Sequence, residues 1–585
     1  MKRILFYVHY NKLSIISQHV LYQLEHMRPL FSKIVFISNS ALNEKDKKKI
    51  ENQHLIDYYI ERENVGFDFA AWRDGMAEIG FEEIKNYDSV TLMNDTCFGP
   101  LWDMKEVYRR FENDSSVNFW GMTNFRRTKH FREHIQSYYM SFSKEVVASN
   151  VFQNFWLCVQ NFTDVQDVIN HYETNITTNL VDAGFSYRTV FDTVGEDTAG
   201  MLHPDFSYYN PTAILRHKVP FIKVKTISAN QSITPYILDE IERKTAYPVD
   251  LIVSHMSKIG YPDLPYLLSR KYLKETKNGQ FENKKIAVHL HVFYLDLLEE
   301  FLEVFQKFEF SYDLFITTNT EEKALEIKDS LQTFHQTAQV LVTGNIGRDV
   351  LPMLKLKEQL ATYDYIGHFH TKKSKEADFW AGQSWRTELI DMLVLPANNI
   401  IKTFNQQDDL GLVIADIPTF FRYNRIVVAW NEHLIAPKMN DLWEKMGLKK
   451  SIDFNSFNTF VMSYGTYIWF KYDALKPLFD LELTDQDVPA EPLPQNSVLH
   501  AIERLLVYIA WDRNYDFKIS PNRIVLTSFI DNKILNNRGD LQPSTYVDFN
   551  YMGGIKGALK YIFILCRSEE RRVGKECRSR WSPYH

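Results

Sequence analysis

Carboxylate and amide side chains follow a strand-like segment in the first half of the chain, where they could bind a cation. The strand-like run 87–93 leads directly into Asn94-Asp95. A carboxylate at a strand end can hold Mg²⁺ or Mn²⁺, and such a cation neutralises the charge of a diphosphate leaving group. We therefore predict Asp95 as a metal ligand, assisted by Asp68 or Asp88. The alternative is a strand-end turn that the Asn and Asp side chains stabilise.

The corresponding position in the second half of the chain has no carboxylate. The sequence there is His370-Thr371-Lys372-Lys373. Two fixed positive charges and two further hydrogen-bonding side chains could bind a diphosphate directly, so we expect no metal in this half. The alternative is an ordinary solvated basic turn.

A short motif, Asn-x-Gly-x-Asp, occurs at the same place in each half. Its glycine permits close approach of the backbone to a nucleotide or a sugar, and its Asn and Asp can accept hydrogen bonds from hydroxyl groups. Polar residues also end earlier strand-like runs. The predicted nucleotide-sugar-binding residues are His9, Asn39, Asn64, Gly66, Asp68, Asp88 and Asn94 in the first half, and His289, Asn319, Asn345, Gly347, Arg348, Asp349, His370, Thr371, Lys372 and Lys373 in the second.

Transfer of a sugar with inversion at its anomeric carbon needs a carboxylate that takes the proton of the acceptor hydroxyl. Glu173 and Glu503 each follow a similar aromatic, strand-like run and lie near the start of a helix-like segment. We predict these two glutamates as the catalytic bases, with Asp197 and Glu491 in reserve. For Glu503, an ion pair with Arg504 or a helix-capping role is the alternative.

The elements that must position these residues repeat along the chain. Apolar runs at 3–9 and 34–38 correspond to runs at 285–289 and 314–318, and the Asn-x-Gly-x-Asp motifs follow at nearly equal spacing. Helix-like segments separate the runs, an order typical of a parallel α/β sheet. Ligands of such sheets bind beyond the carboxyl ends of the strands. We therefore predict two tandem α/β domains, each with a site at that edge.

The composition divides the chain into five predicted parts. The polar stretch 274–284 is the expected linker between an N-terminal domain with a helical extension, 1–273, and a second domain, 285–550. Residues 551–566 are apolar with two lysines, which is typical of an amphipathic helix at a membrane interface; a helix docked on the last domain is the alternative. The Arg-rich end, 567–585, resembles a translated sequencing adapter, so we expect it to lie outside the natural fold.

The overall composition argues against several classes of protein. A net charge of −7 gives no reason to expect nucleic acid as a partner. Four cysteines without metal-ligand spacing argue against a zinc site and a disulfide framework. The N-terminus enters a strand-like run directly and no apolar stretch reaches the roughly 18 residues of a membrane span, so we expect a cytoplasmic protein. Aromatic residues make up 14% of the chain, which suits either sugar-ring stacking or a large aromatic core.

Together these motifs resemble those of the rhamnan synthesis protein F family over residues 1–566. The segments that carry the resemblance are Glu63-Asn64-Val65-Gly66-Phe67-Asp68, Leu92-Met93-Asn94-Asp95 with Gly99-Pro100, Gly344-Asn345-Ile346-Gly347-Arg348-Asp349, His370-Thr371-Lys372-Lys373-Ser374, and Glu491-Pro492 with His500-Ala501-Ile502-Glu503-Arg504. The resemblance implies two tandem glycosyltransferase domains of the Rossmann-like GT-A architecture.

The resemblance also implies an activity and its partners. The protein would be a rhamnosyltransferase that extends the polyrhamnose backbone of a cell-wall polysaccharide, with inversion, from dTDP-L-rhamnose onto a lipid-diphosphate-linked oligosaccharide acceptor. It would act as a peripheral protein at the inner face of the cell membrane, beside other polysaccharide-synthesis enzymes. Two alternatives stay open: one catalytic domain joined to an acceptor-binding domain, or a non-catalytic assembly subunit.

Overall fold

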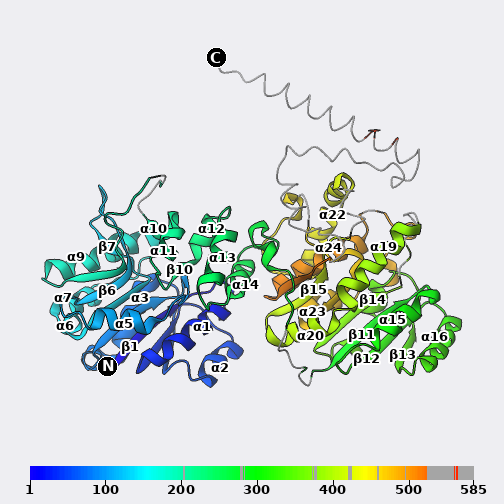
Figure 1. The fold of residues 1–585 in the computed structure, drawn as a ribbon, viewed down its shortest axis with the longest axis horizontal. Coiled ribbons are helices and arrows are strands. Elements are labelled where there is room, and N and C mark those ends of the chain that lie inside the picture. Colours follow the sequence, from blue (N-terminus) through cyan, green and yellow to red (C-terminus); the bar gives the residue numbers. More distant parts are fainter. Residues whose placement is uncertain are drawn as a thin grey trace, which may run out of the picture. The chain divides into compact units, whose positions relative to one another are not determined.

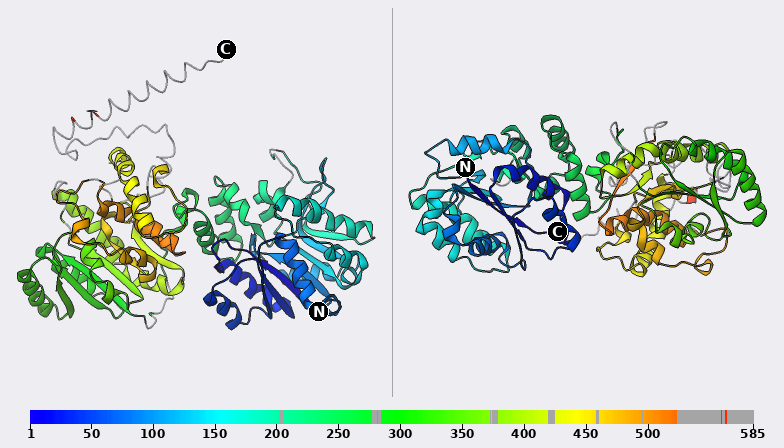
Figure 2. Two further views of the ribbon diagram at one scale, coloured as in Figure 1. Left: turned by 180° about the vertical axis from the view of Figure 1, so that it is seen from behind. Right: turned by 90° about the horizontal axis from the view of Figure 1, so that it is seen from below.

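The computed structural model of the chain forms two compact units, Met1–Ile259 and Gly260–His585. Each unit is a central sheet with helices packed against it (Figure 1), and Figure 2 shows the same sheets from two further directions. The structure describes residues 1–199, 201, 205–276, 281, 284–371, 373, 379–418, 425–457, 460–494, 496–522, 559, 562 and 563.

The sheet of the first unit has the strand order β3-β2-β1-β4-β8-β6-β7, and β9 also pairs with β6. Strand β1 runs parallel to β2 and β4, whereas β8 is antiparallel to both β4 and β6. A short pair, β5 with β10, stands apart. The strands are β1 (Arg3–His9), β2 (Lys33–Ser38), β3 (Tyr58–Glu61), β4 (Ser89–Asn94), β5 (Cys97–Phe98), β6 (Phe119–Phe125), β7 (His134–Ile135), β8 (Tyr139–Ser143), β9 (Tyr187–Phe191) and β10 (Ile222–Lys223).

Helices cover both faces of this sheet. Successive residues of a strand point to opposite faces, so Leu5 and Tyr7 join one hydrophobic cluster with helix α1. Phe6 and Val8 join another with helix α3. Burial on both faces explains why the strand reads as a continuous apolar run. The helices are α1 (Gln18–Met27), α2 (Glu44–Asn52), α3 (Phe67–Ile79), α4 (Phe81–Ile84), α5 (Met104–Glu112), α6 (Lys144–Ala148), α7 (Asn150–Leu157), α8 (Val165–Val168), α9 (Thr174–Asp182), α10 (Phe206–Tyr209), α11 (Pro211–Arg216), α12 (Val224–Ala229), α13 (Thr234–Lys244) and α14 (Val249–Ile259).

The sheet of the second unit repeats this topology. Its order is β13-β12-β11-β14-β16-β15-β17, with β16 antiparallel to both of its neighbours and β17 parallel to β15. The predicted repeat and the α/β class are therefore confirmed. The strands are β11 (Ile286–Val292), β12 (Asp313–Thr318), β13 (Ala338–Val342), β14 (Tyr365–His370), β15 (Leu410–Ala415), β16 (Ile468–Phe470) and β17 (Asp516–Ser520). The helices are α15 (Leu298–Phe305), α16 (Glu321–Thr333), α17 (Val350–Leu354), α18 (Lys357–Leu360), α19 (Phe379–Leu389), α20 (Ala397–Gln406), α22 (Arg425–Lys445), α23 (Tyr472–Asp480) and α24 (Val498–Asp512).

The strand registers show which residues of the two sheets are equivalent. Val8 lies opposite Asn94 in the first sheet, and His291 lies opposite His370 in the second. In each case the second residue is the last of its strand. Asn94 and His370 therefore mark the same point at the carboxyl edges of the two sheets.

The register corrects one expectation about β11. This strand does not end at His289 but continues to Val292, and His289 is fully buried within it, opposite His368. The reason is that Leu290 and Val292 continue the apolar alternation that one face of the strand needs. His9, which ends β1, is therefore equivalent to Val292 and not to His289.

The segment between the two sheets packs with the second unit. A 3₁₀ helix spans Pro265–Arg270, the buried ammonium of Lys271 pairs with Asp516, and Tyr272 bridges to Ile519 of β17. In the expected linker 274–284, the residues at 277–280, 282 and 283 lie outside the described part of the chain.

Candidate functional site

Asp95 lies just beyond the carboxyl end of β4. The backbone N–H of Tyr10, which follows β1, donates a hydrogen bond to Asp95 Oδ2 over 3.0 Å. Burial raises the pKa of Asp95 to about 8, and the nearby charge of Asp68 adds to that rise. A carboxylate in such surroundings would be stabilised strongly by a cation bound beside it.

Asp68 is the second carboxylate at this edge. It lies in the first turn of α3, and the side-chain amide of Asn94 donates to Asp68 Oδ2 over 2.7 Å. Burial raises the pKa of Asp68 to about 6; the Asn94 hydrogen bond opposes the rise and the charge of Glu173 adds to it. Asp68, Asp95 and Glu173 therefore interact electrostatically at one strand end.

Glu173 is held against the loop that precedes β8. It is the last residue of a π-helical turn, Ile169–Glu173, and its Oε1 accepts the backbone N–H of Ser137 over 3.0 Å. The carbonyl of the next residue, Tyr138, accepts the backbone N–H of Asn94 over 3.3 Å. These contacts place the predicted base beside the carboxyl end of β4.

The Asn-x-Gly-x-Asp motif forms a fixed loop that leads into α3. Gly66 has a φ of +70°, and a Cβ atom there would lie 2.5 Å from Ala70 Cβ, so only glycine fits. The side-chain amide of Asn39 donates to Asn64 Oδ1 over 3.1 Å. Arg62 in turn donates to Asn39 Oδ1 over 2.9 Å. The loop thereby presents its aspartate to the strand end.

His9 is the buried residue that faces the Asp95 carboxylate, with 3.9 Å between its Nε2 and Asp95 Oδ2. Its Nδ1 contacts Ser38 Oγ over 3.1 Å, and that hydroxyl donates its own proton to Ser40 O. A proton on Nδ1 would be donated to Ser38 Oγ and would leave a lone pair on Nε2, which has no hydrogen-bond partner among the described residues. Burial lowers the pKa of His9 to about 4, so the ring is neutral near pH 7.

An imidazole nitrogen beside a carboxylate oxygen suits a divalent cation. Within the described part of the chain there is no group of three or more His, Cys, Asp or Glu side chains placed to hold a metal. His9 and Asp95 would therefore supply only part of the coordination, and the phosphates of a substrate would supply the rest, as is usual for Mg²⁺.

Two predicted residues lie away from this group. Asp88 is at the amino end of β4, where its carboxylate accepts the backbone N–H of Lys2 over 2.6 Å. Asp364 binds the N–H of Lys285 in the same way in the second unit, over 2.9 Å. Asp88 therefore ties two parallel strands together at the opposite edge of the sheet and cannot share a ligand with the strand-end carboxylates. Asp197 is exposed and accepts a hydrogen bond from its own loop.

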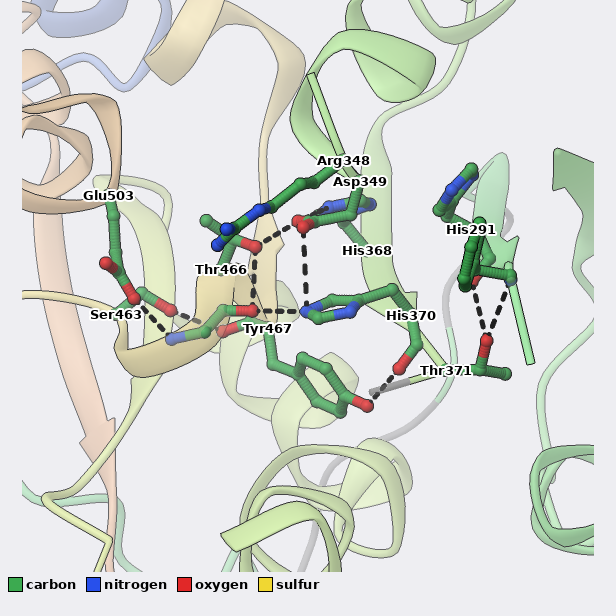
Figure 3. Close-up of polar contacts among 12 residues, drawn as sticks. His291, Arg348, Asp349, His368, His370, Thr371, Ser463, Thr466, Tyr467 and Glu503 are labelled. Atoms are coloured by element: carbon green, nitrogen blue, oxygen red, sulfur yellow. Dashed lines mark hydrogen bonds and ion pairs between the residues drawn. The ribbon is translucent and has the colours of Figure 1, made fainter. Parts of the chain in front are cut away.

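Asp349 is the centre of the corresponding edge in the second unit (Figure 3). Its Oδ2 lies 3.3 Å from His368 Nε2 and accepts a hydrogen bond from Thr466 Oγ1. Its Oδ1 lies 3.8 Å from His370 Nε2. Burial alone would raise the pKa of Asp349, but the two histidines and the threonine outweigh it and hold that pKa well below its usual range. Asp349 is therefore ionised near neutral pH.

Glu503 has the place in the second unit that Glu173 has in the first. It lies in α24, and its Oε1 accepts the backbone N–H of Gly465 over 2.5 Å, in the loop before β16 (Figure 3). Strand β16 is the counterpart of β8 in the strand order. Glu503 Oε2 also accepts a hydrogen bond from Arg504 over 3.3 Å, so the expected contact with that neighbour is present as well.

The residues that follow β14 differ from those that follow β4. Thr371 occupies the position of Asp95, and its Oγ1 accepts two backbone N–H groups of the loop after β11, over 2.9 and 3.0 Å. Lys373 pairs with Asp296. Lys372 lies outside the described residues. The hydroxyl of Thr371 thus braces a loop, and Lys373 has a carboxylate partner.

Other predicted residues of the second unit also contact protein groups. Asn319 Oδ1 accepts a hydrogen bond from Lys323 over 2.9 Å. Arg348 and Glu491 form a largely exposed ion pair, with 2.9 Å between Nε and Oε1. Gly347 has a φ of +80°, like its counterpart in the first unit. Glu491, the reserve candidate for the base, is therefore paired with Arg348.

Sequence reasoning missed several buried polar residues on one face of the second sheet. They are His291, Thr317 and His368, together with Gly465 and Thr466 in the loop before β16. For the histidines a signal was present, since His-x-His occurs in both β11 and β14. Side chains alternate along a strand, so such a pattern puts both rings on one face. Gly465 and Thr466 belong to no sequence pattern that would have indicated their position at the site.

A parallel-rich α/β sheet with polar groups at the carboxyl ends of its strands is typical of nucleotide-binding enzymes. The family model for rhamnan synthesis protein F matches residues 34–515. The chain therefore belongs to the rhamnan synthesis protein F family, as its motifs predicted. Membership supports the predicted glycosyltransferase of rhamnan synthesis.

Two relatives illustrate the similarity to known sequences. The uncharacterized protein y4gN of Sinorhizobium fredii is 30% identical over 173 residues, which are 29% of this chain and 43% of that protein. The uncharacterized protein WxcX of Xanthomonas campestris is 27% identical over 230 residues, 38% of this chain and 30% of that protein. The chain thus spans less than half the length of either relative.

Solved structures show only a distant likeness. The glycosyltransferase GlyE of Streptococcus pneumoniae is 14% identical, with a TM-score of 0.23, over 64% of this chain and 87% of that one. A cytidylyltransferase of Leptospira borgpetersenii is 14% identical, with a TM-score of 0.24, over 44% of this chain and 95% of that one. Among the described residues, no helix combines the length and apolar character that a membrane crossing requires.

Proposed function

We propose that the protein is a rhamnosyltransferase that moves L-rhamnose, with inversion, from dTDP-L-rhamnose to a lipid-diphosphate-linked oligosaccharide. The observation that carries the proposal is the set of carboxylates at the end of β4, Asp68, Asp95 and Glu173, in a chain of the rhamnan synthesis protein F family. An inverting transfer needs one carboxylate as a base and charge neutralisation at the leaving group, and this strand end has groups for both.

In the first unit, Glu173 is the base that takes the proton of the acceptor hydroxyl. The Ser137 N–H holds Glu173 Oε1, and the other carboxylate oxygen would take the proton. Asp95, with the Nε2 lone pair of His9, would hold a divalent cation, which when bound neutralises the diphosphate. Asp68 orients Asn94 through their hydrogen bond.

In the second unit, Glu503 is the corresponding base, and Lys372 with Lys373 binds the diphosphate without a metal. One observation favours a different role for this unit as an acceptor-binding domain. Thr371 stands in the position of the metal-binding Asp95, and its hydroxyl is already committed to the loop after β11. The two roles differ in whether Glu503 is needed for turnover.

The segment 551–566 is proposed to rest on the membrane that carries the lipid-linked acceptor. Most of it lies outside the described residues. The three that are described, Leu559, Ile562 and Phe563, are 60%, 53% and 60% exposed. Large apolar side chains in such a segment suit an interfacial helix that binds lipid.

The test is product analysis with purified protein, dTDP-L-rhamnose and a synthetic lipid-diphosphate rhamnosyl acceptor. We expect rhamnose addition by mass spectrometry and inverted linkages by NMR. Asp95→Asn should abolish addition by the first unit, whereas Asp88→Asn, the matched aspartate at the other end of the same strand, should not. Transfer from another nucleotide sugar but not from dTDP-L-rhamnose would refute the donor, and no transfer from any donor would favour the non-catalytic subunit.

A further inference from the structure

A cleft of about 370 Å³ lies in the first unit, between helix α9, strand β9 and the hairpin that joins β6 to β7. Cavities of about 300 to 1,000 Å³ hold small ligands in proteins. None of the predicted site residues lines this cleft. We call it the hairpin cleft, and its lining residues are Arg127, Arg132, Glu133, Thr178, Val181 and Tyr187.

The hairpin is held in place by contacts at its turn and at both of its ends. Within the turn, the hydroxyl of Thr128 accepts two backbone N–H groups over 3.2 and 3.1 Å. At one end, Arg126 donates to the carbonyl of Thr193. At the other end, Arg132 forms two hydrogen bonds with Asp182 of α9, over 2.8 and 2.9 Å. The walls of the cleft are therefore fixed by contacts within the protein.

The sheet itself does not dictate this hairpin. In the strand order, β15 and β16 of the second unit correspond to β6 and β8 of the first. The connection between β15 and β16 includes helix α22, which has 21 residues, whereas the connection between β6 and β8 consists of the hairpin and β7. One sheet topology therefore accommodates either connection, and the hairpin cleft is a feature of the first unit rather than of the fold.

The polar groups of the cleft combine available donors with available acceptors. Arg127 is exposed, and its guanidinium makes no hydrogen bond or ion pair within the described part of the chain. Glu133 Oε1 accepts hydrogen bonds from Asn124 over 2.8 Å and from Tyr187 over 2.6 Å, whereas its Oε2 accepts none from the described residues. The Thr178 hydroxyl donates to a carbonyl of its own helix over 2.9 Å and can still accept. Since a hydroxyl group both donates and accepts, this combination suits a ligand with several hydroxyls.

The charges around the cleft cancel. The guanidinium groups of Arg127 and Arg132 are balanced by the carboxylates of Glu133 and Asp182, the ion-pair partner of Arg132. A site for a phosphate or a nucleotide would be expected to have an excess of positive charge. The cleft therefore suits a neutral ligand better than an anionic one.

The cleft also offers apolar surface. Val181 is aliphatic and yet 39% exposed, and the half-buried Tyr187 adds its ring. Val181 lies three residues after Thr178, so the two side chains share a face of α9. A 6-deoxy sugar such as L-rhamnose carries a methyl group in addition to its hydroxyls, and that methyl group packs well against a valine. Such a sugar therefore matches both the polar and the apolar groups of the cleft.

Helix α9 connects the hairpin cleft with the candidate base. Glu173 directly precedes this helix, and Thr178 and Val181 lie about 8 and 12 Å further along its axis, at about 1.5 Å per residue. The N–H of Ile135 in β7 donates to Thr177 Oγ1 over 3.0 Å, so the helix is bound to the strand that follows the hairpin. The base and the cleft therefore lie at a fixed separation along one helix.

We propose that the hairpin cleft binds the sugar chain of the acceptor, a neutral oligosaccharide of L-rhamnose, while the reacting end of that chain lies at Glu173. The identity of the sugar and the role of Glu173 rest on the proposed function. In the cleft, Arg127 donates to sugar hydroxyls, Glu133 Oε2 accepts from one, and Val181 contacts a methyl group. Binding of the sugars that do not react holds the growing chain between additions and lowers the acceptor concentration that transfer needs.

The first test needs neither a donor nor transfer. Full-length protein is mixed with a rhamnose oligosaccharide that has no lipid and no diphosphate, and binding is followed by saturation-transfer NMR. We expect saturation to pass most strongly to the methyl groups of the sugars. Arg127→Ala should weaken binding about tenfold, because a hydrogen bond from a charged group is lost. Val181→Asn should remove the preference for the methyl groups.

Lys129→Ala is the matched control, because Lys129 is an exposed cation of the same hairpin that does not line the cleft. This variant should bind the oligosaccharide as the parent does. Equal weakening by Lys129→Ala and Arg127→Ala would indicate a general effect of charge and overturn the site. So would the absence of oligosaccharide binding by the parent, or Arg127-dependent binding of inorganic phosphate in its place.

A second measurement connects the cleft to turnover. With a lipid-linked acceptor that carries several rhamnose residues, Arg127→Ala should raise KM for the acceptor about tenfold, and KM for an acceptor with a single rhamnose should stay unchanged. An equal effect on both acceptors would overturn the role in acceptor binding. If no form transfers rhamnose, the proposed function fails, and the NMR result still decides whether the cleft binds a rhamnose chain.

Discussion

Asp95 is expected to make metal binding release a proton. Its pKa of about 8 means that, at pH 7, the metal-free protein holds about 0.9 of a proton on this carboxylate. Asp68, with a pKa of about 6, holds about 0.1 more. A divalent cation binds the ionised form of Asp95 and also favours ionisation of the neighbouring Asp68, so it must displace these protons. Titration of Mn²⁺ at pH 7 should therefore release about one proton per ion, and at pH 9 about 0.1.

The same pKa sets the pH dependence of affinity and of folding. The apparent affinity for Mn²⁺ should rise about tenfold between pH 7 and pH 9, as Asp95 ionises. Because the folded pKa lies above that of an unfolded aspartate, ionisation opposes folding of the metal-free protein. Its free energy of unfolding should fall as the pH rises from about 4 to about 8, by on the order of 5 kcal/mol from this group.

Calorimetry in buffers with different enthalpies of ionisation counts the released protons directly. Asp95→Asn should abolish the release and flatten the pH dependence of stability, whereas Asp88→Asn should change neither, because that carboxylate is exposed and lies at the other end of β4. Tight Mn²⁺ binding at pH 7 without proton release would refute the reasoning, as would unchanged affinity in Asp95→Asn.

Three further perturbations test other parts of the structure. Glu173→Ala should lower transfer by the first unit about 10² to 10⁴-fold, measured with the lipid-linked acceptor, and a folded variant within threefold of the parent would remove Glu173 from the mechanism. Gly66→Ala places a Cβ 2.5 Å from another and should cost about 2 kcal/mol more than Gly447→Ala, which has a φ of +64° but open space, in urea unfolding; equal losses would contradict the steric argument. EDTA should stop the first linkage, and Lys372→Gln with Lys373→Gln the second, so that linkage analysis finds two different arrested products; full-length polymer from the double variant would favour the acceptor-binding role.

The sequence predicted two sheets of the same kind, but it did not predict the registers of their strands. Strands buried on both faces leave continuous apolar runs, and their repetition along the chain predicted two sheets of one kind. A register depends on which residues pair across strands, and no local pattern records that. His289 illustrates the difference, because the apolar alternation of β11 extends three residues beyond the point at which its polar residue suggested an end.

The candidate sites show a similar limit. Residues after a strand were predicted to gather at one edge, and Asp95 does lie with Asp68 and Glu173. Asp88 was grouped with them because an aspartate just before a strand and one just after it look equally suitable in sequence. Asp88 precedes β4 and Asp95 follows it, so the two carboxylates lie at opposite ends of the strand. The contact between His289 and His368 was not predicted, because the His-x-His pattern of each strand indicates that its rings share a face but not that these two strands, far apart in sequence, pair in this register.

The two sheets differ in their side chains at three equivalent positions, where Leu92, Phe6 and Ile37 of the first unit correspond to His368, His289 and Thr317 of the second. This difference also affects how the folding chain avoids exchanging strands between its halves. Because both sheets have the same order and register, β14 could in principle pair with β1 in place of β11. His368 would then face Phe6 and lose the ring nitrogen that His289 offers. A buried imidazole without a partner costs about 1 to 3 kcal/mol. These polar residues therefore disfavour the swapped strand pairing relative to the native one.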